Sequence, residues 1–416
     1  MANDFSSKID ILFEDVVTGF DAMNLSAKNV SQYKIGAGTL QQAGQTVYRP
    51  VPMLSEVVDG RDMTSSYKDL VEMTVPSTLT DSHLRNVPVQ LTGAELNSPH
   101  LHKRMVEELQ ILLSNKLDTL VAGEVADKAT LLVSSTGSID TYLKAAEADA
   151  LMKEQQCGTG VRCMFLHPRQ AIKFASNLAA RETMNDAPMS AYQRNTLLPI
   201  AGFDTYSVDY AKTIPDSVGS GYLVNGAAQG YTPTAKTSGL PTDNRTGTLI
   251  VDTGSGAVNG AFFTIAGVNS VGHINKQDTG QLKTFRLISG AATTTWVISP
   301  PMIPANGAAA AQKAHGNCVT TAADNAAITF LNVAAAPASV FFKKDAVELI
   351  HADFNTDEFT SHGKKVRKAT TDSGLQIVML SDSSIDTLVA KYRMFVWANA
   401  NVLAPEMAGC MLENQV

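Results

Sequence analysis

Apolar residues recur at three- and four-residue intervals between positions 98 and 128, and this spacing predicts one long amphipathic helix. Ser98 is a suitable N-cap, and Pro99 suits the first helical position, where its missing N–H costs nothing. Roughly 30 residues at about 1.5 Å each give a rod of about 45 Å, so we expect other long elements beside it. The predicted buried stripe consists of Leu101, Met105, Leu109, Leu112, Leu113, Leu120 and Val121.

The N-terminal segment, from residue 1 to about residue 30, shows the same helical spacing, with charged residues between the apolar ones. An amphipathic helix needs a partner for its apolar face. Two partners remain open, namely the rest of the same domain or another protein chain. The apolar positions are Phe5, Ile9, Leu12, Phe13, Val16, Val17 and Phe20.

A period-two pattern over residues 46–51 returns at residues 70–75, which predicts two strands joined by a long excursion. The tip of this excursion, residues 55–68, carries charges of both signs. Such side chains are costly to bury inside one domain, so the tip either lies in water or rests on a neighbouring molecule. The charged residues are Glu56, Asp59, Arg61, Asp62 and Lys68.

The segment that follows the long helix has the pattern of alternating helices and strands. Ser138 is expected to cap a helix over residues 139–156. Residues 161–166 are expected to form a buried strand that leads to a helix opened by Pro168. Two shorter elements follow, a helix and then an extended segment broken by a glycine: residues 189–196, and residues 198–208 with Gly202.

The composition changes at about residue 221, where Gly, Thr, Ser, Asn and Pro become frequent and helical spacing disappears. We expect residues 221–338 to form an inserted all-β domain, with Ala/Gly/Pro-rich connectors at 306–311 and 333–338. Strand-like patterns resume after residue 339, so the chain returns to the domain that it left. The expected strands are 248–251, 262–266, 284–288 and 296–298 inside the insertion, and 347–350, 375–380 and 392–398 after it.

The net charge of -7 and the sequence pI of about 5.6 argue against a dedicated nucleic-acid-binding protein, which would be basic. An acidic protein can still lie beside packaged nucleic acid. No leader peptide and no apolar run of about 20 residues is recognisable, so we expect a protein made in the cytoplasm without membrane contact. The scattered cysteines predict buried free thiols rather than a zinc site or disulfides: Cys157, Cys163, Cys318 and Cys410.

No catalytic, nucleotide-binding or metal-binding motif is recognisable in the chain. Three glycines within residues 254–260 have the wrong spacing for a phosphate-binding loop and are better explained by a hairpin turn. His100 and His102 lie on different helix faces and cannot share a metal ion. We therefore predict no catalytic residue, no metal and no cofactor. The basic run at 364–368 is either a solvated strand or a contact with an acidic neighbour or packaged nucleic acid.

The order of these parts resembles the tailed-phage major capsid fold. More closely, the chain resembles the coat proteins of short-tailed Salmonella-type phages, type phage P-twenty-two, which carry an inserted β-domain. The resemblance spans nearly the whole chain and rests on the order of the segments more than on any single motif. The segments that carry it are 86–91, 201–204, 263–268, 339–346 and 374–406, the last with Trp397-Ala398-Asn399-Ala400 and Ala404-Pro405-Glu406.

This resemblance implies an α+β protein with a long spine helix, an extended β-hairpin loop, an axial domain and an inserted, barrel-like all-β domain. It also implies a division of the chain. The expected parts are an N-terminal arm helix (1–35), a peripheral domain (36–135) with the extended loop (about 51–70) and the spine helix (98–128), an axial domain (136–220), the inserted β-domain (221–338) and returning strands of the axial and peripheral domains (339–416).

The resemblance further implies a major capsid protein of the virion that assembles through hexamers and pentamers into an icosahedral head shell, with scaffolding-assisted procapsid assembly and later expansion. The implied partners are other copies of the chain, a scaffolding protein, a portal and packaged double-stranded DNA, bound on the inner surface without sequence specificity. The implied contact residues are Glu56, Asp59, Arg61, Asp62 and Lys68 in the extended loop, Lys236, Asp243 and Arg245 in a contact loop of the inserted domain, and Phe5, Asp10, Phe13, Glu14 and Asp15 in the N-terminal arm.

Two other hypotheses remain open from the sequence. A non-viral compartment shell of the same fold would need cargo peptides and no scaffold. A polysaccharide-active or adhesive protein would use residues 221–338 as a carbohydrate-binding module, with exposed aromatic side chains. The aromatic residues of this region fall mainly in strand-like runs, where packing in a core is the simpler explanation: Tyr222, Tyr231, Phe262, Phe263, Phe285, Trp296 and Phe330.

Overall fold

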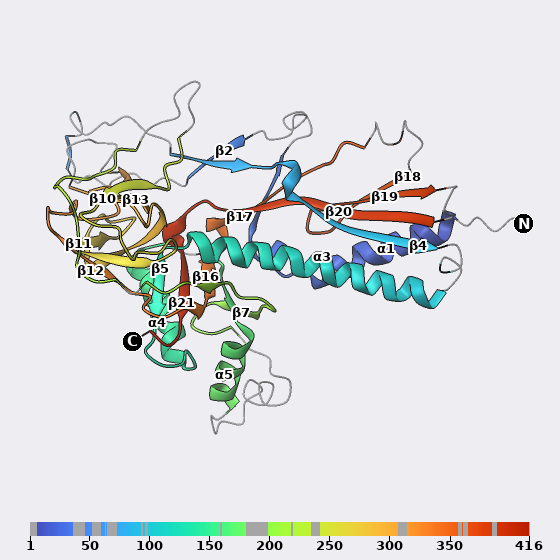
Figure 1. Cartoon of the computed structure of the whole chain (residues 1–416), viewed down its shortest axis with the longest axis horizontal. Helices are drawn as coiled ribbons and strands as arrows, with labels where there is room; N and C mark the ends of the chain where they lie inside the picture. The colour runs from blue at the N-terminus through green and yellow to red at the C-terminus, as the bar shows by residue number, and fades with distance from the viewer. Residues whose placement is uncertain are drawn as a thin grey trace, which may run out of the picture. The chain divides into compact units, whose positions relative to one another are not determined.

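The structure is a computed structural model in which the chain forms two compact units, each built from segments distant in sequence (Figure 1). The first unit comprises Met1–Val47, Ser77–Val121 and Glu348–Asn401, and the second comprises Tyr48–Pro76, Ala122–Val347 and Val402–Val416. The residues that the structure describes are 6–35, 46–51, 60–62, 64, 73–92, 95, 99–158, 160–179, 199–217, 219–233, 242–306, 314–356, 360, 365–384 and 389–415.

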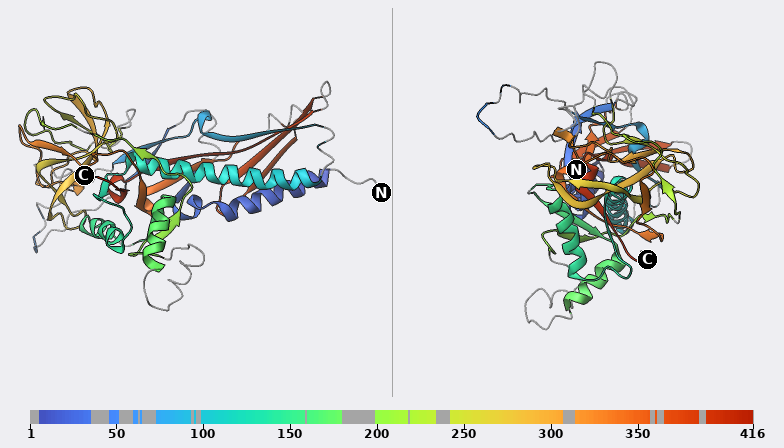
Figure 2. Two further views of the ribbon diagram at one scale, coloured as in Figure 1. Left: turned by 60° about the horizontal axis from the view of Figure 1, so that its bottom comes forward. Right: turned by 90° about the vertical axis from the view of Figure 1, so that its left-hand side faces the viewer.

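Helix α1 (Ser6–Met23) lies side by side with the long helix α3 (Pro99–Lys128), of which the residues up to Val121 belong to the first unit (Figure 1, Figure 2). Gly19 permits the close approach, because a Cβ atom there would lie 2.0 Å from Nε2 of Gln110. That same nitrogen donates a 2.7 Å hydrogen bond to the backbone oxygen of Asp15. The described apolar face of α1 is therefore buried within its own unit, through Phe13, Val16 and Phe20.

The helix predicted for residues 98–128 is confirmed by α3, although Ser98 and the side chain of Leu101 lie outside the described part of the chain. The prediction that Leu112 is buried is wrong, because its side chain is 46% exposed. At about 100° per residue, Leu112 falls roughly 60° to the far side of Leu109, away from the buried arc. That arc advances four residues at a time through Leu109, Leu113, Leu117 and Val121.

A six-stranded sheet accompanies these helices. Its long strands β19 and β20 are antiparallel, and β20 also pairs with β4. The strand order is β1 (Ser31–Ile35), β17 (Val347–Ala352), β20 (Val389–Val402), β19 (Gln376–Ser384) and β18 (Lys365–Thr370), with β4 (Leu84–Thr92) placed on β20. The strands expected after the insertion are confirmed, and the described part of the basic run is the edge strand β18, with Lys365 and Lys368 exposed.

The predicted excursion begins and ends in a two-stranded sheet made of β2 (Thr46–Pro50) and β3 (Thr74–Thr78). The backbone N–H of Val51 donates a 2.9 Å hydrogen bond to the oxygen of Met73, so the chain leaves and returns at one place. The first strand matches its prediction, whereas residues 65–72, where the second was expected to begin, lie outside the described residues.

The second unit contains a five-stranded sheet with the helices α4 (Tyr142–Glu154) and α5 (Pro168–Ala179). Its central strand β16 is antiparallel to both neighbours, and the outer pairs β5–β21 and β6–β7 are parallel. The order is β5 (Leu131–Ser134), β21 (Ala408–Leu412), β16 (Ser339–Lys343), β6 (Arg162–Leu166) and β7 (Asp204–Ser207). The predicted strand at 161–166 and the helix opened by Pro168 are thus confirmed.

One helix start in this region differs from its prediction. Helix α4 begins at Tyr142 after the N-cap residue Thr141, and Ser138 does not cap it. The reason is that Ile139 is fully buried in the core of the sheet, so the chain there packs on the core before the helix begins. The hydroxyl of Ser138 instead accepts a hydrogen bond of 3.1 Å from Nζ of Lys173. The short helix expected at residues 189–196 lies outside the described residues.

Six strands of the inserted region close into a barrel. Their order is β10 (Gly247–Ile250), β13 (Thr295–Ser299), β12 (Asp278–Ser289), β11 (Phe262–Val271), β14 (Ala327–Phe330) and β9 (Tyr222–Leu223). The first and last strands are joined by a bridge between Val224 and Val251, where the N–H of Asn225 donates to the oxygen of Ile250 at 3.0 Å. Because the barrel is closed, neither β9 nor β10 is an open edge. The strands predicted for this region are confirmed.

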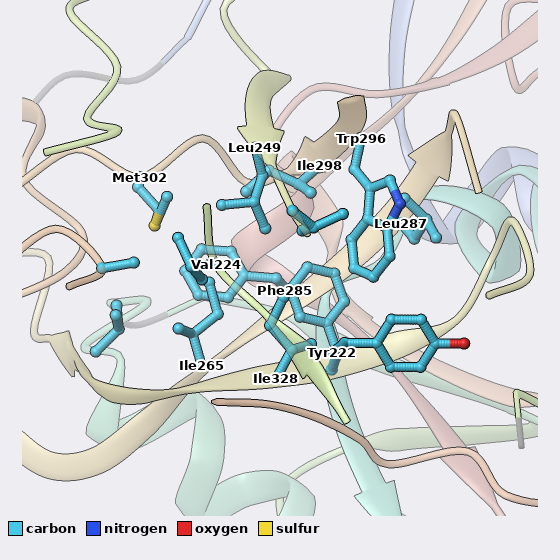
Figure 3. Packing of buried hydrophobic residues seen from close by; sticks show 14 of the residues in the cluster. Tyr222, Val224, Leu249, Ile265, Phe285, Leu287, Trp296, Ile298, Met302 and Ile328 are labelled. Carbon is cyan, nitrogen blue, oxygen red and sulfur yellow. The ribbon is translucent and has the colours of Figure 1, made fainter. Parts of the chain in front are cut away.

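Aliphatic side chains and aromatic rings fill the barrel together (Figure 3). The ring of Phe263 lies 5.7 Å from that of Trp296 and 5.8 Å from that of Phe285, measured between centroids. Tyr222 reaches the edge of this cluster, and its hydroxyl donates a 2.8 Å hydrogen bond to the oxygen of Ser255. The aromatic residues predicted to be core residues are therefore buried, apart from the half-buried Tyr231.

The barrel is attached through two adjacent segments. Strand β8 (Thr213–Ile214), before the barrel, pairs antiparallel with β15 (Ala336–Pro337), after it, so that Ile214 faces Ala336. Strand β16 then follows directly. The chain thus enters and leaves the barrel at one place, as expected for an insertion.

Candidate assembly surfaces

Of the five charged residues predicted at the tip of the extended loop, Arg61 and Asp62 are described, and both are exposed. The carboxylate of Asp62 accepts hydrogen bonds from the hydroxyl of Thr64 at 2.5 Å and from its backbone N–H at 3.0 Å. These bonds favour the ionised form and lower the pKa of Asp62. The remaining predicted residues, Glu56, Asp59 and Lys68, lie outside the described residues.

In the N-terminal arm, the acidic residues Glu14 and Asp15 are exposed on α1, while Phe13 is buried in the same unit. The helix therefore presents acidic side chains to solvent and uses its described apolar side internally. Phe5 lies outside the described residues, and so does the side chain of Asp10. A docking role for these residues stays a prediction.

In the contact loop of the inserted domain, Arg245 and Asp243 form a two-pronged ion pair, with Nε and Nη2 donating at 2.9 and 2.8 Å. A third nitrogen, Nη1, donates to the oxygen of Val402 at 2.8 Å. Burial opposes ionisation of Asp243, but Arg245 outweighs it and holds the pKa below its usual value. The guanidinium thus binds within its own unit, while Lys236 lies outside the described residues, and the contact role stays a prediction.

A cluster of ionisable side chains that the sequence did not reveal lies where the barrel meets the five-stranded sheet. Lys283 on β12 donates a hydrogen bond to Glu406 in the short 3₁₀ helix η4 (Pro405–Met407). Lys283 is 3% and Glu406 18% exposed. Nε2 of His273 lies 3.7 Å from the same carboxylate and has no hydrogen-bond partner.

Burial lowers the pKa of His273 to about 4, against the opposing field of Glu406, so its imidazole is neutral at pH 7. Burial also opposes ionisation of Glu406, but Lys283 and His273 outweigh it and lower the pKa of that carboxyl. The cluster is therefore an ion pair between Lys283 and Glu406 with an uncharged imidazole beside it.

A signal for half of this cluster was present in the sequence. Phe285 and Leu287 face the barrel interior, and Lys283 precedes Phe285 by two residues. Strand alternation therefore predicts burial for Lys283, and a buried ammonium needs an anionic partner. The identity of that partner, 123 residues further along the chain, is set by the tertiary fold and not by spacing.

The four thiols are free and buried, as predicted. Burial raises the pKa of Cys157, Cys163 and Cys318 to about 12, which suppresses the reactive thiolate. Among the described residues, His, Cys, Asp and Glu form no group of three or more that could hold a metal ion. None of the described helices is long and apolar enough to cross a membrane.

The comparison with protein families decides between the hypotheses. The family described as "P22 coat protein - gene protein 5" matches residues 1–413 of the 416-residue chain. The chain belongs to the P22 coat protein family. This coat protein is a structural component of the virion, not an enzyme, and it builds the icosahedral head of a tailed phage. Membership favours the phage-coat hypothesis over the compartment-shell and carbohydrate-binding hypotheses.

Solved structures similar to this coat protein include one from Mycobacterium phage Che8, at 8% identity and a TM-score of 0.44, covering 93% of this chain and 90% of that chain. The CUS-3 coat protein I-domain matches at 36% identity and a TM-score of 0.24, covering 27% of this chain and 97% of that chain. The crystal structure of a virus-like particle from Pyrococcus furiosus matches at 7% identity and a TM-score of 0.40, covering 97% of this chain and 99% of that chain.

Proposed function

We propose that this coat protein assembles through hexamers and pentamers, with a scaffolding protein and a portal, into a procapsid that later expands around double-stranded DNA. The family match over residues 1–413 carries the proposal. We also propose the domain division given above, in which α3 and β4 belong to the peripheral domain and β6 and β7 to the axial domain. When many copies form a closed shell, each contact between subunits can be weak, because the contacts already made raise the effective concentration for the next ones.

The extended loop is proposed as a contact with a neighbouring subunit. Its support is the local geometry: Val51 and Met73 are hydrogen-bonded at its base, and Arg61 and Asp62 are exposed at its tip. The carboxylate of Asp62 is hydrogen-bonded to the nearby Thr64 and is exposed, so it costs the fold little. Glu14 and Asp15 on α1 and the loop near Asp243 are proposed as further contacts.

The function is tested by expressing the chain with and without its neighbouring genes and examining the particles by negative-stain electron microscopy. Uniform closed shells with the neighbours, and aberrant spirals or polymers without them, are expected. A monodisperse monomer under every condition would exclude the proposal.

The loop contact is tested by replacing Glu56, Asp59, Arg61 and Asp62 with Ala. We expect the thermal unfolding of the unassembled subunit to stay nearly unchanged, because exposed charges contribute about 0–1 kcal/mol each, while shell yield falls. Lys153→Ala/Glu154→Ala, which removes exposed charges from α4, serves as the control and should assemble normally. A large loss of subunit stability would show instead that the loop packs within its own subunit.

A further inference from the structure

The barrel and the five-stranded sheet of the second unit each have a hydrophobic cluster of their own. The two bodies meet where β12 and the turn at 272–277 face β5, η4 and residues 155–156, which follow α4. We call this region the junction. The hydrogen bonds that cross it involve charged side chains, a glutamine and backbone groups. Polar contacts are directional, so the junction can specify an orientation more sharply than an apolar contact of the same size.

The first link is the ion pair between Lys283 and Glu406. Glu406 is held on the side of the sheet, because the oxygen of Pro405 accepts hydrogen bonds from the N–H of Thr130 at 3.2 Å and from its hydroxyl at 2.9 Å. Lys283 is held in the barrel by strand β12. Each partner is therefore fixed to one body, and the pair connects the two.

Two more links lie along the same hairpin. Nη1 of Arg286 donates to the oxygen of Ala129 at 3.1 Å, and its guanidinium lies 4.6 Å from the centre of the Phe262 ring. Oε1 of Gln156, two residues after the end of α4, accepts from the N–H groups of Ile274 and Asn275 at 3.1 and 2.9 Å. Because the hairpin is attached at three positions, both its orientation relative to the sheet and its distance from the sheet are constrained.

A cavity borders Glu406 and is also lined by His273, Lys276, Asn317 and Leu403. Because there is empty space beside the carboxylate of Glu406, close packing on that side does not fix the positions of the two charges. The hydrogen-bonding geometry of the pair must therefore supply the constraint.

We propose that Lys283 and Glu406 are positioning residues that set the orientation of the barrel on the subunit, and with it the geometry at which neighbouring subunits meet. The second clause rests on the assembly function proposed above. A buried ion pair adds little net stability, because desolvation of the two charges offsets their attraction, but it is satisfied in only one geometry. Loss of the ion pair should therefore change the orientation of the barrel more than the stability of the subunit.

The proposal is tested in the full-length chain with the double variant Lys283→Met/Glu406→Leu, which removes both charges and keeps the volume similar. Spin labels are placed at Ile172→Cys on α5 and Ile250→Cys on β10, both exposed, while the native thiols are buried. Electron–electron double resonance then reports the distance distribution between sheet and barrel in the unassembled subunit. We expect the distribution to broaden roughly twofold with the urea midpoint unchanged, because the links at Arg286 and Gln156 remain while the constraint of the ion pair is lost and domain movement is less restricted.

The matched control is Lys144→Met/Glu147→Leu, which removes a partly exposed ion pair within α4 and should leave the distribution as in the wild type. Shells of the junction variant, assembled with the neighbouring genes, should vary in diameter, whereas wild type and control give one diameter. An unchanged distance distribution, or shells of the single wild-type diameter, overturns the proposal. If the wild type forms no shells, the proposed function fails, and the distance measurement still decides whether the pair orients the barrel.

Should the double variant not yield soluble subunit, Glu406→Asp takes its place. This change keeps the charge and shortens the side chain by one methylene, so the carboxylate reaches Lys283 only if the barrel tilts. A shifted or broadened distribution supports the proposal, and a distribution identical to that of the wild type overturns it.

Discussion

At the scale of single residues, the cost of burying polar groups explains which side chains are paired. Lys283 and Arg286 are nearly inaccessible, and each has a partner on the sheet side of the junction. His273 differs, because its Nε2 atom has no hydrogen-bond partner and the ring stays neutral. A group that is neutral when folded and protonated when unfolded makes stability depend on pH.

The direction in which stability changes with pH follows from the lowered pKa of His273. Between its ordinary value of 6.5 and about 4, the unfolded chain binds a proton that the folded chain does not. Stability is therefore complete above 6.5 and is lost as the pH falls towards 4, by about 3 kcal/mol in total at 1.36 kcal/mol per pKa unit. Glu406, whose pKa is also lowered, adds a further loss only below about 4.5.

We expect His273→Gln, which carries no charge at any pH, to flatten the dependence of the unfolding free energy on pH between 6.5 and 4. The measurement is urea unfolding of the unassembled subunit at several pH values. Burial also lowers the pKa of His167 and His351, but both remain in the variant, so the difference between the two proteins isolates His273. Equal slopes for variant and wild type would refute this assignment.

At the scale of elements, helix α3 separates what periodicity can and cannot predict. The length of the helix follows from residues 99–128 alone, because strong helix formers and apolar residues recur throughout. The periodicity does not determine which residues of the helix are buried, because three- and four-residue spacing admits both Leu112 and Leu117. Only the neighbouring elements select one of the two. Leu117 is buried and Leu112 exposed.

This difference makes a direct prediction about the two leucines. Leu117→Ala should cost about 2–5 kcal/mol of unfolding free energy, because it leaves a cavity in a fully buried site. Leu112→Ala should change it by no more than about 0.5 kcal/mol, as expected for an exposed position. Urea titrations of both variants against the wild type provide the measurement, and losses of equal size would mean that the helix face is wrongly placed.

The strands were similarly predictable where alternation is clear. The patterns around Phe263, Phe285 and Trp296 fix both the strands and the core of the barrel. The start of α4 was not predictable, because Ser138 is a good cap in sequence and only the burial of Ile139 in the sheet moves the helix to Tyr142. The partner of Lys283 was hidden for the same reason, since long-range contacts leave no local signal.

At the scale of the whole molecule, the barrel has the properties of a separate folding unit. Its strands close on themselves, its core is its own, and its two attachment strands are paired at Ile214 and Ala336. A segment with a closed hydrogen-bond network and neighbouring ends needs little from the rest of the chain. The family and the order of segments were evident from sequence, whereas this autonomy emerges from the strand pairing.

We therefore expect residues 215–335, expressed alone, to unfold cooperatively in urea. Trp296 is the one tryptophan in this fragment and is fully buried, so its fluorescence reports the transition. Phe263→Ala should lower the stability of the fragment by about 3–5 kcal/mol, whereas Leu282→Ala, at an exposed position, should not. A fragment whose tryptophan emission is already that of an unfolded chain would contradict the expectation.

Because the barrel lies between β6 and β16 in the sequence, it is translated after β6 and before β16. Strand β6 ends at Leu166, and its partner β16 begins only at Ser339, after the whole barrel has been translated. At about 5–20 residues per second, the roughly 170 intervening residues take on the order of 10 to 30 seconds. Throughout that interval β6 is without β16 as a partner, while the barrel emerges with all its own strands. The inserted module can therefore be complete on the ribosome before the sheet that carries it has been made.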